Sequence, residues 1–431
     1  MRSLSFKISA WFFVLASCLC AVVVEAGEEG VRQFRGNATR TYYGSGPAPL
    51  DTPAVIWRFR TGQQFTPSLE TPWEGLGWTG QPAVSVEGDS TFVYVGALDG
   101  HVYKLRFDDG TLVRKSPDNF YIIKSSPAIT DRYVVVGAWD NAVHILDRRT
   151  LERIHSDTAI WTPSASYDFD SSPLIIDSLL YIGGEDGYVR KLLLRPPFPR
   201  LWHYPRRTPT SPYTYGDTDK PYVGIESSVA MAGDRLVVGT GSGKVWFLDP
   251  GSGRLMAEFL TGDDTDGTPV VDTADSSVYI GVECDFTERP GGLYKLGWDG
   301  SERWFFETGK KGIFSTPALD DERVFLTADD AWLYALDRRD GHLHWKTRLL
   351  DGSWSSPLVV DGLVIAADYA GALYGIDAAT GAMRWRIRLG NYIVSSPVIW
   401  NGTILVGTRD GFVCALRAAS NGPSAEAPTA K

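Results

Sequence analysis

Acidic residues precede three copies of a short recurring motif, and they are the side chains of this sequence whose spacing suggests chemistry. Carboxylates gathered at one place can bind a divalent cation such as Ca²⁺, or a basic segment of a partner protein. The plainer interpretation is that they cap the starts of strands and stay solvated, and the sequence leaves both open. The candidate binding residues are Asp168, Asp170, Glu226, Asp264 and Asp266.

No established catalytic motif accompanies these carboxylates. The six histidines are scattered along the chain, and neither a Gly-x-Ser-x-Gly nor a His-Glu-x-x-His sequence occurs. Gly239–Lys244 resembles a phosphate-binding loop, but it lacks the Ser or Thr after the lysine and leads into a strand-like run. We therefore predict no catalytic residues, and we interpret the chain as more consistent with a binding protein than with an enzyme.

The acidic residues are positioned by a repeated unit of about 45 residues. Each copy begins with Ser-Ser-Pro or a related tripeptide and continues with short apolar runs separated by Asp/Gly turns, as in Ser355–Gly390. Such runs are typical of a four-stranded antiparallel meander, which cannot bury both of its faces alone. Eight copies in sequence predict an all-β fold, an eight-bladed β-propeller of four-stranded antiparallel blades.

The eighth copy ends at Leu416 without an outer strand, and the missing strand is found near the N-terminus. The segment Trp57–Gly62 resembles the outer strands around Trp345 and Trp385. We therefore predict that an N-terminal strand closes the ring, which removes exposed sheet edges. Tryptophans in register on the outer strands should dock against the neighbouring blade, and these are Trp57, Trp202, Trp304, Trp345 and Trp385.

The remaining segments flank the predicted propeller, which covers residues 57–417. Residues 1–26 combine a basic start, an apolar run and small residues at the end, which is typical of a signal peptide. The alternatives are an uncleaved anchor, or a lipoprotein anchored to the membrane through Cys18. Residues 27–56 should form an extended arm and residues 418–431 a disordered tail. The formal net charge of −10 argues against a nucleic-acid partner.

The longest connections all fall on the same side of the expected disc, whereas the turns on the other side stay minimal. Elaboration of one face of a rigid scaffold indicates the face that binds. Cys284 and Cys414 belong to blades 5 and 8 and should be free thiols. The enlarged segments are Thr61–Thr79, Lys115–Lys124, His155–Asp170, Pro205–Glu226 and Glu283–Gly292.

The turns that contain Asp337 and Gly341, and again Asp377 and Gly381, each followed by tryptophan, resemble the repeat of pyrroloquinoline-quinone (PQQ) propellers. Within these PQQ-like repeat propellers the chain is most similar to the BamB type of bacterial outer-membrane assembly. There an Asp-x-Asp before Thr-Pro-Val-Val belongs to the partner-contacting face, as in Asp264–Val271 here. The family has a second partner-contacting element next to this one, and of that element the present sequence has only Glu226-Ser227.

This resemblance implies a non-catalytic, exported scaffold of the periplasm or cell envelope that binds an exported protein or envelope component and needs no cofactor. Two alternatives stay open. The PQQ-dependent alcohol and sugar dehydrogenases of the same family use PQQ with Ca²⁺ and a disulfide between adjacent cysteines, whereas no two cysteines are adjacent in this chain. The other alternative is a propeller that binds a glycan or an envelope polymer.

Overall fold

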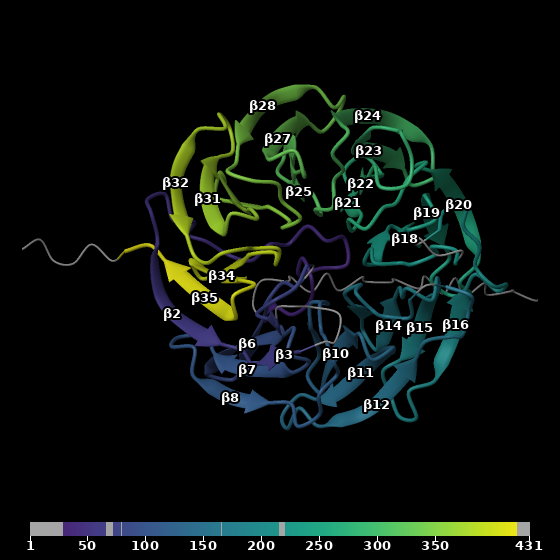
Figure 1. Cartoon of the computed structure of the whole chain (residues 1–431), viewed down its shortest axis with the longest axis horizontal. Coiled ribbons are helices and arrows are strands. Elements are labelled where there is room, and N and C mark those ends of the chain that lie inside the picture. The colour runs from purple at the N-terminus through teal and green to yellow at the C-terminus, as the bar shows by residue number, and fades with distance from the viewer. Residues whose placement is uncertain (1–28, 66–71, 79, 165, 215–219, 420–431) are drawn as a thin grey trace, which may run out of the picture.

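The computed structural model describes residues 29–65, 72–78, 80–164, 166–214 and 220–419, whose strands form a ring of eight sheets (Figure 1). No helix occurs in this part of the chain, and therefore none of a length and apolarity that could cross a bilayer. The predicted eight-bladed β-propeller is confirmed. The predicted signal peptide, Cys18 and nearly all of the predicted tail lie outside the described residues.

The first four blades follow one another along the chain, each running from an inner first strand to an outer fourth strand (Figure 1). Blade 1 contains β5 (Ala83–Glu87), β6 (Ser90–Gly96), β7 (Val102–Arg106) and β8 (Leu112–Lys115). Blade 2 contains β9 (Ala128–Ile129), β10 (Tyr133–Ala138), β11 (Ala142–Asp147) and β12 (Arg153–Thr158). Blade 3 contains β13 (Leu174–Ile176), β14 (Leu179–Ile182), β15 (Val189–Leu193) and β16 (Arg200–Tyr204). Blade 4 contains β17 (Ala230–Ala232), β18 (Arg235–Thr240), β19 (Lys244–Leu248) and β20 (Leu255–Leu260).

The other four blades complete the ring. Blade 5 contains β21 (Val270–Asp272), β22 (Ser277–Val282), β23 (Gly291–Gly297) and β24 (Glu302–Gly309). Blade 6 contains β25 (Ala318–Leu319), β26 (Arg323–Thr327), β27 (Trp332–Asp337) and β28 (Leu343–Arg348). Blade 7 contains β29 (Leu358–Val360), β30 (Leu363–Ala367), β31 (Ala372–Asp377) and β32 (Met383–Arg388). Blade 8 contains β33 (Val398–Trp400), β34 (Thr403–Gly407), β35 (Phe412–Arg417) and, as its outer strand, β2 (Ala54–Arg60).

Blade 8 joins the two ends of the propeller. Strand β2 pairs antiparallel with β35, with Trp57 opposite Ala415 and Phe59 opposite Val413. The prediction that an N-terminal strand closes the ring is therefore confirmed. Because this pairing supplies the last outer strand, the ring can open only if β2 detaches from β35.

Outer-strand tryptophans dock onto the turn between the third and fourth strands of the next blade. The Trp57 indole N–H donates to Phe107 O at 2.8 Å, and the ring covers Gly110 of blade 1. Gly110 has a positive φ of 71°, and a Cβ there would lie 2.6 Å from the indole, so only glycine fits this contact. Trp202, Trp304 and Trp345 cover the equivalent glycines Gly253, Gly341 and Gly381.

Hydroxyl groups of the recurring tripeptides form a second connection between blades, near the axis of the ring. The backbone N–H of Ser126 donates to Ser172 Oγ of the next blade, and the N–H of Ser172 donates to Ser228 Oγ in turn. The chain of hydrogen bonds continues through Thr268 and Thr316 as far as Ser396. The Ser-Ser-Pro motif thus has a structural role, because its second residue links each inner strand to the next.

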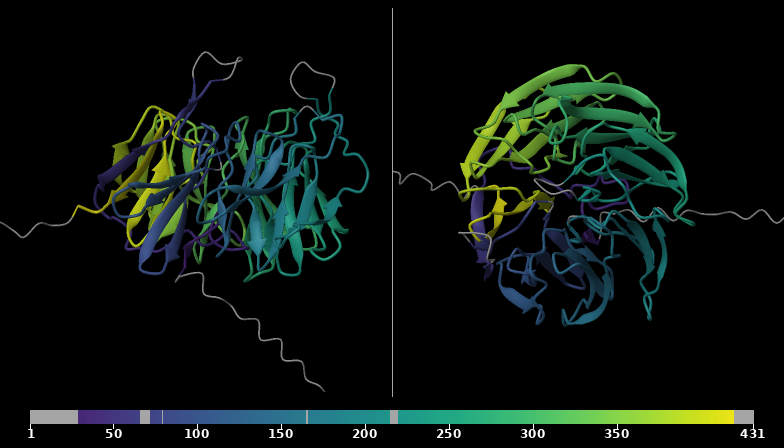
Figure 2. Two further views of the ribbon diagram at one scale, coloured as in Figure 1. Left: turned by 90° about the horizontal axis from the view of Figure 1, so that it is seen from below. Right: turned by 45° about the vertical axis from the view of Figure 1, so that its right-hand side comes forward.

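Residues 29–50, which we call the arm, run across one end of the ring (Figures 1 and 2). Strand β1 (Gly30–Val31) pairs with β5 of blade 1. Hydrogen bonds or bridges join the rest of the arm to each of blades 2 to 8. At its end, Pro49 O accepts the indole N–H of Trp385, which has no blade-8 turn to dock against. We call this side of the disc the closed face.

Two arginines of the arm are fully buried on the closed face, and carbonyl groups hold them. Arg40 donates from Nε and Nη2 to Val229 O and from Nη1 to Phe34 O. Arg35 donates from Nη2 to Thr316 O at 2.7 Å and lies 4.9 Å from the Tyr43 ring centroid. Burial lowers the pKa of both guanidinium groups, to about 10 for Arg35 and about 9 for Arg40, so both stay charged at neutral pH.

Candidate functional site

The opposite side of the disc, which we call the open face, contains a cavity of about 440 Å³. Loops that precede the first strands and hairpins between second and third strands surround it. Strands β3 (Gln63–Gln64) and β4 (Trp73–Glu74) form a small ribbon that projects from this face (Figure 2, left). The enlarged connections predicted from the sequence therefore include those that line the cavity.

One position of the repeat supplies much of the cavity wall. The residue immediately before the recurring tripeptide turns its side chain toward the channel in most blades, because the first strand begins nearest the axis. Hairpin residues, among them Glu283 and Arg409, complete the wall. The lining residues at the position before the tripeptide are Lys124, Glu226, Asp266, Phe314, Trp354 and Val394.

The wall has an aromatic side, formed by blades 6 to 8 together with the ribbon that precedes blade 1. Trp354 packs against Phe314 and Trp78, with ring centroids 4.7 and 6.3 Å apart. Trp73 on β4 lies under the guanidinium of Arg409, whose carbon is 4.4 Å from the ring centroid. Flat aromatic surfaces next to a cavity provide apolar contact area of the kind that anchors a binding partner.

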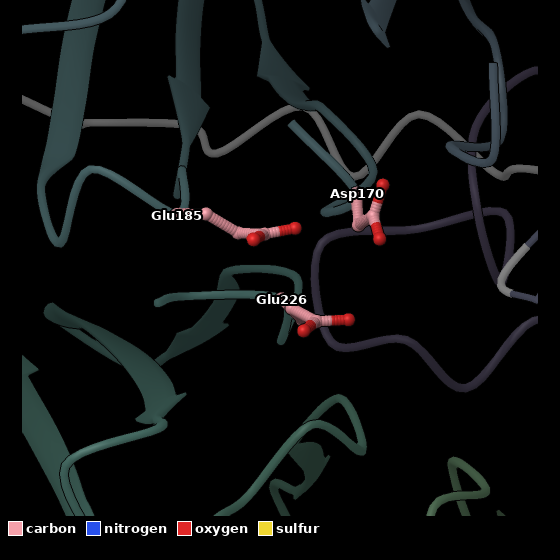
Figure 3. Close-up of side chains that lie close together, drawn as sticks. All are labelled: Asp170, Glu185 and Glu226. Atoms are coloured by element: carbon pink, nitrogen blue, oxygen red, sulfur yellow. The ribbon is translucent and has the colours of Figure 1, made fainter. Parts of the chain in front are cut away.

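The opposite wall, formed by blades 3 to 5, is acidic, and its Glu226 forms a first group of carboxylates together with Asp170 and Glu185 (Figure 3). Lys124 provides the counter-charge, with its Nζ 2.6 Å from Asp170 Oδ2 and 4.2 Å from the Trp139 ring centroid. We call these three carboxylates the lysine-paired triad. The charged form of Lys124 is favoured, since its pKa is raised by Asp170, Glu226 and Glu185 against an opposing effect of burial.

Burial and mutual repulsion raise the pKa of the carboxyl groups around this triad. Burial and the neighbouring Asp170 raise the pKa of Glu226 to about 7. Burial, again followed by Asp170, raises the pKa of Asp168 to about 7. The pKa of Glu185 lies well above its ordinary value for the same two kinds of reason, with Glu226 as the main neighbouring charge. Glu226 and Asp168 therefore exchange protons near neutral pH.

The second group of carboxylates is Asp264, Asp266 and Glu283 on blades 4 and 5, which we call the open triad. The side chains are buried, with 3% of Asp264 and 8% of Asp266 exposed. Burial, followed by the charge of Glu226, raises the pKa of Asp264 to about 8. Burial, followed by the charge of Asp264, raises the pKa of Asp266 and Glu283 well above their ordinary values. Three carboxylates here cannot all ionise without a cation.

A fourth aspartate of the same segment, Asp263, has a structural role. Its carboxylate accepts the backbone N–H groups of Asp285, Phe286 and Thr287 and also the Thr287 hydroxyl. These bonds fix the hairpin between β22 and β23 against the segment that precedes β21. They hold Glu283 beside Asp264 and Asp266, so the open triad is positioned by a rigid support.

All five carboxylates predicted as binding residues lie around the channel on the open face. Three of them are not the solvated caps of the plainer interpretation, because Asp170 is fully buried and Asp264 and Asp266 nearly so, whereas Asp168 and Glu226 are partly buried. Glu185 and Glu283 were missed. Both occupy the same position of the hairpin after the second strand, so the repeat register could have identified them. Cys284 and Cys414, the cysteines of the described residues, are free, as predicted.

The sequence matches the protein family described as "Outer membrane protein assembly factor BamB" over residues 49–347 and 351–422. A curated relative with the same description, from Alkalilimnicola ehrlichii, is 31% identical over 143 residues. That match covers 32% of this chain and only 36% of the relative. The family match thus extends over nearly the whole propeller, whereas the individual relative is similar over about a third of its length.

Solved structures of several kinds share the fold. BamB from Moraxella catarrhalis aligns with a TM-score of 0.62 and 15% identity, over 86% of this chain and 99% of that one. A quinohemoprotein alcohol dehydrogenase from Pseudomonas putida aligns with a TM-score of 0.69 and 13% identity, over 92% and 81%. A computationally designed protein, Ika8, aligns with a TM-score of 0.59 and 15% identity, over 80% and 99%. At these identities the likeness concerns the fold alone.

Proposed function

Because this chain belongs to the family of the outer membrane protein assembly factor BamB, we propose that it is a non-catalytic scaffold in outer-membrane protein assembly. In this role it is exported to the periplasm, and its open face binds a component of the assembly machinery. A lipid anchor at Cys18 would hold it at the membrane, and a cleaved signal peptide would leave it free in the periplasm.

The observation that carries this proposal is the contrast between the two faces. The arm covers the closed face, whereas the open face presents a cavity with one aromatic and one acidic side. Large apolar side chains also stand exposed in the connections of the open face, with 68% of Phe65 and 82% of Trp161 accessible. Exposed aromatic residues around an acidic cavity suit a partner segment that carries both basic and apolar side chains.

The dehydrogenase alternative makes a different prediction about the same cavity. It requires turnover of an alcohol or sugar when PQQ and Ca²⁺ are supplied, measured by reduction of an electron-accepting dye. Glycan binding predicts saturable affinity for purified envelope polymers. The scaffold proposal predicts no turnover, and robust dye reduction would contradict it.

The direct test measures binding of the purified chain to purified components of the outer-membrane assembly machinery from the same organism. We expect that replacing both Phe65 and Trp161 with alanine weakens binding at least about tenfold, since exposed aromatic anchors carry much of an interface's affinity. Leu50→Ala is the matched control, because Leu50 is 61% exposed in the arm of the closed face. Unchanged binding of the double variant, or an equal loss in the control, would contradict the proposal.

A further inference from the structure

We propose that the open triad, Asp264, Asp266 and Glu283, is a binding site for one divalent cation of the Ca²⁺ class. The site goes beyond the proposed scaffold function, because it concerns the isolated chain and does not depend on any partner. Its ligands are three carboxylates at the base of a cavity that water can enter. Hard oxygen ligands of this kind are the ones that Ca²⁺ selects in proteins.

The spacing of the three groups fits a cation of this size. One carboxylate oxygen from each residue lies within 4.8 Å of the other two. Even at that largest allowed spacing, a point equidistant from three oxygens is about 2.8 Å from each, and Ca²⁺ binds oxygen at about 2.3–2.6 Å. A cation between the three groups can therefore contact all of them after small side-chain movements. Because Ca²⁺ takes six to eight oxygens, water from the cavity completes the shell.

An unsatisfied atom within the triad indicates that a ligand is required there. Asp266 is 92% buried, yet its Oδ1 has no hydrogen-bond partner among the described residues. A buried carboxylate oxygen without a donor is costly, by roughly 1–3 kcal/mol or more for a charged group. In contrast, the carboxylate of Asp263 in the same segment accepts hydrogen bonds from three backbone N–H groups and a hydroxyl.

The lysine-paired triad shows how the protein treats a carboxylate cluster that needs no external cation. There, Lys124 reaches Asp170 at 2.6 Å. In the described part of the chain, no lysine, arginine or histidine forms an ion pair with any member of the open triad. The two clusters are similar in composition and burial, and they differ in that only one has an internal cation. The three carboxylates of the open triad can therefore all ionise only when a cation from solution binds there.

Calcium binding to the purified, metal-stripped chain tests the proposal. Isothermal titration calorimetry should show one Ca²⁺ per chain, with a rise in the melting temperature as Ca²⁺ is added. Terbium provides a local probe, because Trp78 and Trp354 line the same cavity and can transfer excitation energy to a bound Tb³⁺. We expect sensitised Tb³⁺ emission that Ca²⁺ competes away.

Isosteric variants locate the site. Asp266→Asn and Glu283→Gln should each weaken Ca²⁺ binding at least about tenfold, since each removes one of three charged ligands. Glu185→Gln is the matched control, because it neutralises a buried carboxylate of the lysine-paired triad and should leave Ca²⁺ affinity within about twofold. Circular dichroism confirms that each variant is folded. Absence of Ca²⁺ binding to the parent chain, or equal affinity in Asp266→Asn, would overturn the proposal.

Discussion

The two faces of the disc solve the problem of buried charge in opposite ways. On the closed face, Arg35 and Arg40 are fully buried, and carbonyl oxygens accept hydrogen bonds from all three nitrogens of the Arg40 guanidinium but only from Nη2 of Arg35. On the open face, buried carboxylates lie close together, and one of their oxygens, Asp266 Oδ1, has no hydrogen-bond partner among the described residues. The closed face is covered by the arm, whereas the open face presents a cavity lined by carboxylates.

We therefore expect the closed face to contribute mainly to the stability of the fold and the open face mainly to binding. Contacts of the closed face join the arm to all eight blades, so a change there should act on the folding of the ring as a whole. Carboxylates of the open face repel one another and oppose folding, which is typical of groups retained for binding. Variants that remove an arm contact on the closed face and variants that neutralise a carboxylate of the open triad should therefore move stability in opposite directions.

The largest effect is expected where the chain ends meet. Trp57→Ala removes an indole that is 7% exposed and docked on blade 1, and it weakens the pairing of β2 with β35. We expect the free energy of unfolding to fall by about 3–5 kcal/mol, as for other buried aromatic truncations. Urea denaturation monitored by circular dichroism measures it, and Trp161→Ala serves as an exposed control with little effect. Parent-like stability of the Trp57 variant would show that closure contributes little.

A smaller effect should distinguish the two carboxylate clusters. Lys124→Met leaves the lysine-paired triad without its cation, and the chain should lose about 2–4 kcal/mol at pH 8, since breaking a buried pair strands its partner. In metal-free buffer, Asp266→Asn should change stability by less than about 1 kcal/mol, or increase it, because it relieves repulsion. If Asp266→Asn lowers the free energy of unfolding more than Lys124→Met does in metal-free buffer, the proposed difference between the two clusters is contradicted.

The smallest effect concerns pH. Burial and Asp170 raise the pKa of Asp168 to about 7, so the folded chain binds this proton more tightly than the unfolded chain, where the pKa is about 3.9. The stability that this proton contributes is present below about pH 4 and is lost as the pH rises through about 7. Asparagine does not ionise, so the Asp168→Asn variant does not suffer the loss of stability that the parent shows as the pH rises. The stability of the variant relative to the parent should therefore rise between pH 4 and 8.

Urea denaturation at several pH values between 4 and 8 measures how the difference in the free energy of unfolding between Asp168→Asn and the parent changes with pH. Asp377→Asn is the control, since Arg384 and Thr380 lower the pKa of Asp377 to about 2. The stability contributed by Asp377 is lost only as the pH falls toward 2, so its variant should differ from the parent by a constant amount across the window. A constant difference for Asp168→Asn as well would contradict the raised pKa.

The sequence predicts the ring because the same local pattern is repeated. Turn chemistry, the recurring Ser-Ser-Pro and the position of Trp57 specify eight blades and their closure without any long-range information. The path of the arm was beyond such reasoning, since Arg35 and Arg40 have no periodicity and their acceptors are backbone carbonyls of distant blades. Their burial is visible only in three dimensions.

The sequence predicted where the carboxylates of the candidate site lie in the fold, but it did not predict that they are buried. Register placed Asp170, Glu226 and Asp266 at one end of the channel, because each precedes the same tripeptide. Sequence could not show that they are buried, since their exposure depends on loop residues such as Tyr222 and Phe286, which line the same cavity. Nor could it separate Asp263, which holds a hairpin, from Asp264 and Asp266, which line the cavity.

Site-specific photo-crosslinking in cells tests the central claim most directly. A photoreactive amino acid is placed at Trp161 on the open face or at Leu50 on the closed face, and captured proteins are identified by mass spectrometry. The account predicts that position 161 crosslinks to a component of the outer-membrane assembly machinery and that position 50 does not. Capture of that component from position 50 alone would contradict the assignment of the binding face.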